Sequence, residues 1–146
     1  MNIFNSINIS SSSLTAEKTR IDIIAKNMAN ANTTRTTGGS PYRRQMVVFE
    51  ENKANSFSQQ LNSKLNKING YGVKISKIVE DESPFKLVYE PGHPDADENG
   101  YVKMPNVDIV KEMVDLISAQ RSYDANITSI NASKSMLMKA LEIGRR

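Results

Sequence analysis

The chain has 146 residues, of which 24% are charged, with 19 Lys and Arg against 16 Asp and Glu and no cysteine. The formal net charge is only +3 and the basic residues are scattered along the chain, which argues against a nucleic-acid partner. The lack of cysteine excludes disulfides, thiol nucleophiles and zinc sites built on Cys. Residues 1–13 have no signal-peptide pattern and no apolar run reaches about 18 residues, so we expect neither a cleaved signal nor membrane insertion.

Residues 1–34 carry the pattern of an amphipathic helix. Apolar residues repeat every seven positions, the spacing of a coiled-coil seam, at Ile7, Leu14, Ile21 and Met28. Many Asn and Ser residues in the first half lower the helix propensity, because their side chains compete for backbone hydrogen bonds. We expect this helix to become ordered by packing against another element, and to end between Asn30 and Thr34.

Residues 35–105 predict a small β-rich insertion. Three strand-like runs stand out, at Met46–Phe49, Gly72–Val79 and Phe85–Tyr89. Arg43 and Arg44, which precede the first of these runs, form the densest basic spot in the chain. Residues 52–69 are rich in Asn, Ser and Lys, so a flexible loop and a helix on Phe57, Leu61, Leu65 and Ile68 both stay open.

Residues 106–146 predict the clearest helix of the chain. It opens after a proline, with Asn106 as its N-cap and Asp108 in its first turn. A second seam repeats every seven positions, at Ile109, Leu116, Tyr123, Ile130 and Leu137. Three positions further on, small residues such as Ala119 and Ala140 would allow another helix to approach closely.

The two terminal helices predict the fold class. We expect a mainly α chain in which the N- and C-terminal helices pair antiparallel as a coiled-coil-like core domain, with the short β-rich region between them. A helix from Val107 to Ile143 would be about 55 Å long, more than the central region can cover. Its remaining apolar flanks should therefore pack against other chains.

The single histidine is the first candidate for a catalytic group. His93 lies between Gly92 and Pro94 in an expected turn, without the partner and pocket that a general base needs. No phosphate loop or nucleophile motif accompanies it. We therefore predict no catalytic residue and no cofactor, and an exposed histidine at this turn.

The following segment imitates a calcium loop. Its start matches an EF-hand at Asp95, Asp97, Asn99 and Gly100. The twelfth position, where calcium requires a Glu, is the neutral Asn106. We predict a polar turn and no metal site; an enzyme that uses His93, Asp95 and Asp97 remains an alternative hypothesis.

The order of helix, break, β-rich insert and longer helix resembles that of the flagellar axial proteins. The stretch NMANANT is similar to the signature of the flagellar basal-body rod family, with matching residues at Asn27, Ala29, Asn30 and Thr33. Lys26 stands where the family has a smaller polar residue. Three longer stretches, 41–49, 89–108 and 118–144, resemble the proximal-rod members of the family rather than its distal-rod or hook members.

The resemblance implies a structural subunit of the proximal rod of the bacterial flagellar basal body, without enzymatic activity, which transmits torque across the periplasm. It also implies export by the flagellar type III apparatus without a cleaved signal peptide, and termini that become ordered on incorporation. The implied partners are other copies of the chain and the rod proteins FlgB, FlgF and FliE.

Together with the heptads, the resemblance predicts an assembly interface on both terminal helices, at Ile7, Leu14, Ile21, Met28, Ile109, Leu116, Ala119, Tyr123, Ile130, Leu137 and Ala140. Three asparagines, Asn27, Asn30 and Asn126, either hydrogen-bond across chains or are satisfied within their own chain, and both possibilities stay open. A cytoplasmic coiled-coil adaptor or flagellar export chaperone is the alternative function.

Overall fold

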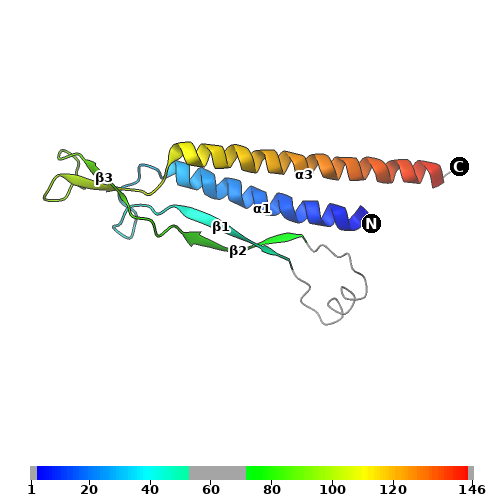
Figure 1. The fold of residues 1–146 in the computed structure, drawn as a ribbon, viewed down its shortest axis with the longest axis horizontal. Helices are drawn as coiled ribbons and strands as arrows, with labels where there is room; N and C mark the ends of the chain where they lie inside the picture. The colour runs from blue at the N-terminus through cyan, green and yellow to red at the C-terminus, as the bar shows by residue number, and fades with distance from the viewer. Residues whose placement is uncertain (1–2, 53–71, 145–146) are drawn as a thin grey trace, which may run out of the picture. The chain divides into compact units, whose positions relative to one another are not determined.

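The computed structural model describes residues 3–52 and 72–144 of the chain. Within these two ranges, two long helices and four short strands follow one another in the order α1 (Ile3–Ala29), β1 (Gln45–Glu51), β2 (Val73–Glu80), β3 (Lys86–Tyr89), β4 (Tyr101–Met104) and α3 (Ile109–Gly144) (Figure 1). The prediction of a mainly helical chain with a small β region is confirmed. The choice between helix and loop for residues 52–69 falls, apart from Asn52, outside the described residues. No helix in the described ranges is long and apolar enough to cross a membrane.

The strands form two separate two-stranded sheets. β1 pairs with β2, and β3 pairs antiparallel with β4, so that Lys86 lies opposite Met104 and Tyr89 opposite Tyr101. The three predicted strands exist with boundaries shifted by one or two residues, whereas β4 was not predicted. Its four residues directly follow the polar turn, where Gly100 has a φ of +80°, and are too few to show a clear alternation.

The prediction that Asn106 caps the second helix is wrong. α3 begins at Ile109, and the carboxylate of Asp108 accepts the N–H groups of Val110 and Lys111 at 3.0 and 3.4 Å. The Asn106 side chain instead accepts the N–H of Arg44 at 2.9 Å. Because the Asn106 side chain is engaged in this tertiary hydrogen bond, Asp108 caps the helix in its place.

The described residues fall into two compact units. Unit 1 comprises Met1–Thr19, Phe49–Ser76 and Ala119–Arg146, and unit 2 comprises Arg20–Val48 and Lys77–Ser118. Within unit 2, α1 and α3 run antiparallel, because Asn27 contacts Glu112 at 3.0 Å and the earlier Arg20 pairs with the later Asp115 at 3.8 Å. The division into domains at residues 34 and 106 stays a prediction.

The two units bury different kinds of side chain. Among the described residues of unit 1, the buried ones are small: Ser10, Ala16, Ala119 and Ser133. A hydrogen bond of 3.0 Å from Asn126 to the hydroxyl of Ser13 joins its two helices. Besides Ala31, unit 2 buries larger side chains, namely Ile24, Asn27, Tyr42, Val102, Val107 and Glu112. The larger apolar core and the two largest buried polar side chains, Asn27 and Glu112, are thus both in unit 2.

Gly72 fixes the start of β2 against α1 within unit 1. Its φ is +80°, and an added Cβ would overlap the hydroxyl of Ser12. That hydroxyl accepts the N–H of Val73 at 3.1 Å and donates to the carbonyl of Ile9 at 2.7 Å. No side chain fits at Gly72 without displacing this bridge between strand and helix.

We predict that Gly72→Ala lowers the free energy of unfolding by about 2 kcal/mol, because it adds backbone strain and breaks the Ser12 bridge. Urea titration followed by circular dichroism measures the change. Gly92→Ala is the matched control, since nothing lies within 4 Å of a Cβ at Gly92. Equal stability of the two variants would contradict this account of Gly72.

Candidate functional site

The side chain of Asn27 is the centre of a buried polar cluster in unit 2. Its amide nitrogen donates to the carbonyl of Gln45 at 2.8 Å and to the carboxylate of Glu112 at 3.0 Å. Its oxygen accepts the Tyr42 hydroxyl and the Gln45 N–H, both at 2.9 Å. All four hydrogen-bonding positions of the amide are therefore filled, while the residue is 1% exposed. Asn27 is satisfied within its own chain.

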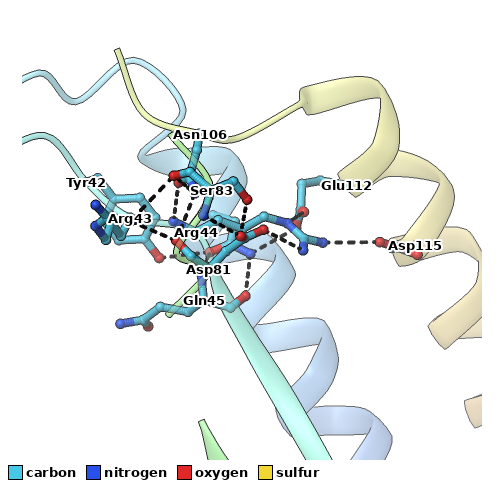
Figure 2. Close-up of polar contacts among 10 residues, drawn as sticks. Tyr42, Arg43, Arg44, Gln45, Asp81, Ser83, Asn106, Glu112 and Asp115 are labelled. Atoms are coloured by element: carbon cyan, nitrogen blue, oxygen red, sulfur yellow. Dashed lines mark hydrogen bonds and ion pairs between the residues drawn. The ribbon is translucent and has the colours of Figure 1, made fainter. Parts of the chain in front are cut away.

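A buried ion pair extends this cluster toward the start of α3. Glu112 is completely buried, and its second carboxylate oxygen accepts the Nε of Arg44 at 2.6 Å. The same guanidinium lies 3.5 Å from Asp115 and 3.7 Å from Asp81 (Figure 2). A buried carboxylate is tolerated only when it is paired and hydrogen-bonded, and Arg44 and Asn27 supply both requirements.

The turn after β2 is held by the same group of residues. Asn106 donates to the carbonyls of Asp81 and Ser83 at 3.0 and 3.3 Å, and Arg43 donates to the carbonyl of Asp81 at 3.0 Å (Figure 2). The guanidinium of Arg43 also lies 4.5 Å from the centre of the Phe85 ring. The two arginines of the basic spot thus both bind groups of their own chain.

We call the set of Asn27, Tyr42, Arg43, Arg44, Asp81, Asn106, Glu112 and Asp115 the polar joint. It links α1, the entry to β1, the turn after β2 and the first turns of α3. The pKa values of two residues of the joint, Asp81 and Tyr42, are shifted from their ordinary values. Hydrogen bonds from Ser83, with Arg44 nearby, lower the pKa of Asp81, whereas burial and then the charges of Glu112 and Glu80 raise the pKa of Tyr42.

The predicted seam residues occupy different environments. On α1, Ile7, Leu14, Ile21 and Met28 are all half-buried. On α3, Ala119 is buried, and Leu116, Tyr123, Ile130 and Leu137 are half-buried. Ile109 and Ala140, at the two ends of the predicted stripe, are exposed.

The family-motif residues lie at the end of α1. Asn27 belongs to the polar joint, and Ala29 is exposed. Asn30 donates to the carbonyl of Lys26 at 2.9 Å and accepts the hydroxyl of Thr33 at 3.2 Å, which stabilises the break after the helix. Asn126 likewise donates to Ser13 and to the carbonyl of Ser122. These contacts are all within one chain.

The first turns of α3 carry a second apolar face that the heptad analysis did not single out. We call it the outer stripe: Val110, Met113, Val114 and Ile117, between 47% and 71% exposed. The spacing i, i+3, i+4, i+7 places these residues on one side of the helix. Glu112 and Ala119, both 0% exposed, lie on the opposite side. This stretch of α3 therefore buries Glu112 and Ala119, with Leu116 half-buried, and exposes an apolar stripe on its outer side.

The segment that imitates a calcium loop forms a turn between β3 and β4. Asp95 accepts the hydroxyl of Thr34 at 2.8 Å and lies 3.8 Å from Arg35. Gly100 donates its N–H to the carbonyl of Asp97 at 2.8 Å, which closes the polar turn predicted from the sequence. Among the residues described, no three His, Asp or Glu side chains group together as a metal site requires.

Sequence reasoning missed the polar joint and the outer stripe. Glu112 lies at a seam position, which signals that a basic residue pairs with it inside the fold. The sequence does not say which of the 19 Lys and Arg residues is that partner. The spacing of Val110, Met113, Val114 and Ile117 was visible, yet it was masked by the heptads on the other side of the same helix.

We predict that Asn27→Asp lowers the free energy of unfolding by about 3 kcal/mol. The change removes both amide donors and places a second carboxylate next to Glu112. Thermal and urea unfolding measure the loss, with Asn8→Asp on the exposed side of α1 as the control. A fully stable Asn27→Asp variant would show that the buried amide donors are not needed.

The lowered pKa of Asp81 predicts a pH dependence. Because the unfolded chain binds this proton more readily, the carboxylate contributes stability that is present above about pH 4 and is lost as the pH falls through the lowered folded value. The stability difference between the wild type and Asp81→Asn should therefore shrink from about pH 6 to about pH 3. Glu82→Gln, an exposed neighbour, controls for loss of one charge. A difference independent of pH would contradict this role.

Comparison with known proteins gives the family. The family model described as "Flagella basal body rod protein" matches residues 7–35, and "Flagellar basal body rod FlgEFG protein C-terminal" matches residues 98–143. Three proteins named "Flagellar basal-body rod protein FlgC" are similar along almost the whole chain. The Bacillus subtilis protein is 54% identical, with 99% of this chain and 100% of its own length covered; the Borreliella burgdorferi protein is 48% identical, with 98% of each; and the Salmonella typhimurium protein is 45% identical, with 99% and 100%. The chain belongs to the FlgC family of flagellar basal-body rod proteins.

Proposed function

We propose that this chain is a structural subunit of the proximal rod of the flagellar basal body. It assembles through its terminal helices into a helical tube that transmits torque across the periplasm. The FlgC relatives, all named as basal-body rod proteins, support the rod role. The single structural observation that carries the proposal is the exposed outer stripe on the side of α3 opposite the buried Glu112.

A helix with this polarity is suited to an assembly. Soluble helices normally turn their apolar side to the core and their charged side to water. Here the carboxylate of Glu112 faces inward, and the outer stripe is exposed. Exposed apolar faces of this kind mark surfaces that another protein covers. In a rod, the neighbouring subunits that surround each subunit would cover such a face along the whole helix.

The polar joint gives the subunit the stiffness that torque transmission requires. It connects α1, the strands and α3 through filled hydrogen bonds and a buried ion pair. Groups held this way have few alternative arrangements, because a broken contact leaves a buried charge unpaired. Force that reaches the β region of unit 2 can thus pass to its helices without a loose connection.

The remaining seam residues are proposed as the packing surface of the terminal segments, 1–34 and 106–146. The half-buried members of both helices leave part of each side chain for contact with a neighbouring subunit, while exposed Ile109 and Ala140 contribute the ends of the surface. Among the described residues of unit 1 the buried ones are all small, so its helix pairing leaves part of the apolar surface of the seam residues uncovered. Neighbouring subunits supply the missing burial, and these ends become ordered on incorporation.

The proposed partners are other copies of the chain and the rod proteins FlgB, FlgF and FliE. The chain reaches them through the flagellar type III export apparatus without a cleaved signal peptide, and acts without catalysis. A cytoplasmic adaptor or export chaperone is the competing function. Recovery of the chain in purified basal bodies supports the rod subunit, whereas a stable one-to-one cytoplasmic complex that never leaves the cell would overturn it.

We predict that Val114→Glu abolishes motility and incorporation into basal bodies without unfolding the chain. Val114 is 63% exposed, so the free energy of unfolding should change by less than about 1 kcal/mol, while a charge placed in a packed interface costs several kcal/mol. Swimming in soft agar, purification of basal bodies and urea titration measure the three quantities.

Two further variants complete this test. Ser129→Glu, exposed on the same helix but more than three turns beyond the outer stripe and off its line, should retain motility. Leu116→Glu, at a half-buried seam position, should lose both stability and assembly. Normal rods from Val114→Glu would remove the outer stripe from the assembly surface.

A further inference from the structure

The turn between β3 and β4 contains the only histidine of the chain, and its ring takes part in a hydrogen bond. The Nδ1 atom of His93 accepts the backbone N–H of Asp95 at 3.1 Å. The ring is half-buried, whereas the sequence predicted an exposed histidine. A ring nitrogen that accepts a hydrogen bond carries no proton, so this contact requires the neutral imidazole with its proton on Nε2.

The residue that His93 holds connects the turn to the loop after α1. The carboxylate of Asp95 accepts the hydroxyl of Thr34 at 2.8 Å and lies 3.8 Å from the guanidinium of Arg35. We call these four residues, His93, Asp95, Thr34 and Arg35, the turn latch. All of them belong to unit 2. The latch thus joins two segments that are about 60 positions apart in the sequence.

The loop end of the latch lies next to the polar joint. The carbonyl of Thr33, the residue before Thr34, accepts the N–H of Tyr42 at 3.1 Å. The hydroxyl of Tyr42 in turn donates to Asn27 at 2.9 Å. A change in the latch therefore acts on the backbone one residue away from a contact of the joint.

We propose that His93 makes the turn latch sensitive to pH, so that the latch is intact with the neutral ring and breaks when the ring gains a proton. This inference goes beyond the proposed function and does not depend on it. An imidazolium donates from both nitrogens, so its Nδ1–H would face the N–H of Asp95, and the hydrogen bond is lost. The charged ring then competes with Arg35 for the carboxylate of Asp95.

The pH range of the change follows from the ionisable groups around the turn. They lie on the turn itself, on the loop after α1 and on β4: Glu90, Asp95, Asp97, Glu98, Arg35, Tyr101 and Lys103. Carboxylic acids ordinarily change charge below about pH 5, and Tyr, Lys and Arg above about pH 9. Histidine is the side chain that ordinarily does so between about pH 5 and pH 8. Because the latch needs the neutral ring, it is intact above this range and is lost as the pH falls through it.

An NMR titration of the full chain tests the latch. Proton–nitrogen spectra follow the backbone amides of Thr34, Arg35 and Asp95 from about pH 8 to about pH 5, while the ring signals of His93 report its charge. We expect the three amide signals to shift with the same midpoint as the ring. Protection of the Asp95 amide from hydrogen exchange, corrected for the intrinsic effect of pH, should fall about fivefold, the size of one hydrogen bond.

Two variants assign the change to His93. In His93→Asn the side-chain oxygen accepts the same N–H in an Asx turn but does not titrate, so the signals of Thr34 and Arg35 should stay at their neutral-pH positions. His93→Ala has no acceptor, and its Asp95 amide should exchange as fast at about pH 8 as the corrected wild-type value at about pH 5.

Three results would overturn the inference. In the first, the wild-type signals of Thr34 and Arg35 do not follow the titration of the ring. In the second, His93→Asn keeps the change with pH, which means that another group causes it. In the third, protection of the Asp95 amide rises in acid, which means that attraction between the charged ring and the carboxylate outweighs the lost hydrogen bond.

Discussion

The buried carboxylate of Glu112 is the constraint on which the rest of unit 2 depends. It has no exposure to water, so its charge requires the Arg44 guanidinium at 2.6 Å and the Asn27 amide at 3.0 Å. Asn27 in turn needs Tyr42 and the backbone of Gln45 to fill its remaining positions. Satisfying one group therefore fixes α1, the entry to β1 and the start of α3 in a single arrangement.

This use of polarity changes the role of the apolar residues. Because the polar joint holds unit 2 together, the residues of the outer stripe stay exposed in the single chain: Val110, Met113, Val114 and Ile117. They remain available for neighbours. In unit 1, small buried residues such as Ala16 and Ser133 give the helix pair close contact but little apolar burial. We propose that contacts with neighbouring subunits add to the stability of both units.

The sequence predicts the parts of this structure that repeat along the chain. Heptads at Ile7 to Met28 and Leu116 to Leu137 predicted two long helices, and local turn chemistry predicted the loop at Asp97–Gly100. The polar joint pairs residues that are far apart in the sequence. Asn27 is 15 positions from Tyr42 and 85 positions from Glu112, and no local pattern encodes such pairings. The wrong prediction of Asn106 as the N-cap has the same cause. Its side chain accepts the N–H of Arg44, 62 positions away, and this contact cannot be read from the local sequence.

Polar contacts within the chain hold unit 2 together, and we propose that a neighbouring subunit covers its apolar outer stripe. Hydroxyl-radical footprinting of the purified chain and of basal bodies tests both halves at once. The account predicts strong labelling of Met113 in the free chain, its protection in basal bodies, and protection of Tyr42 in both states. Equal labelling of Met113 in both states, or strong labelling of Tyr42 in the free chain, would contradict it.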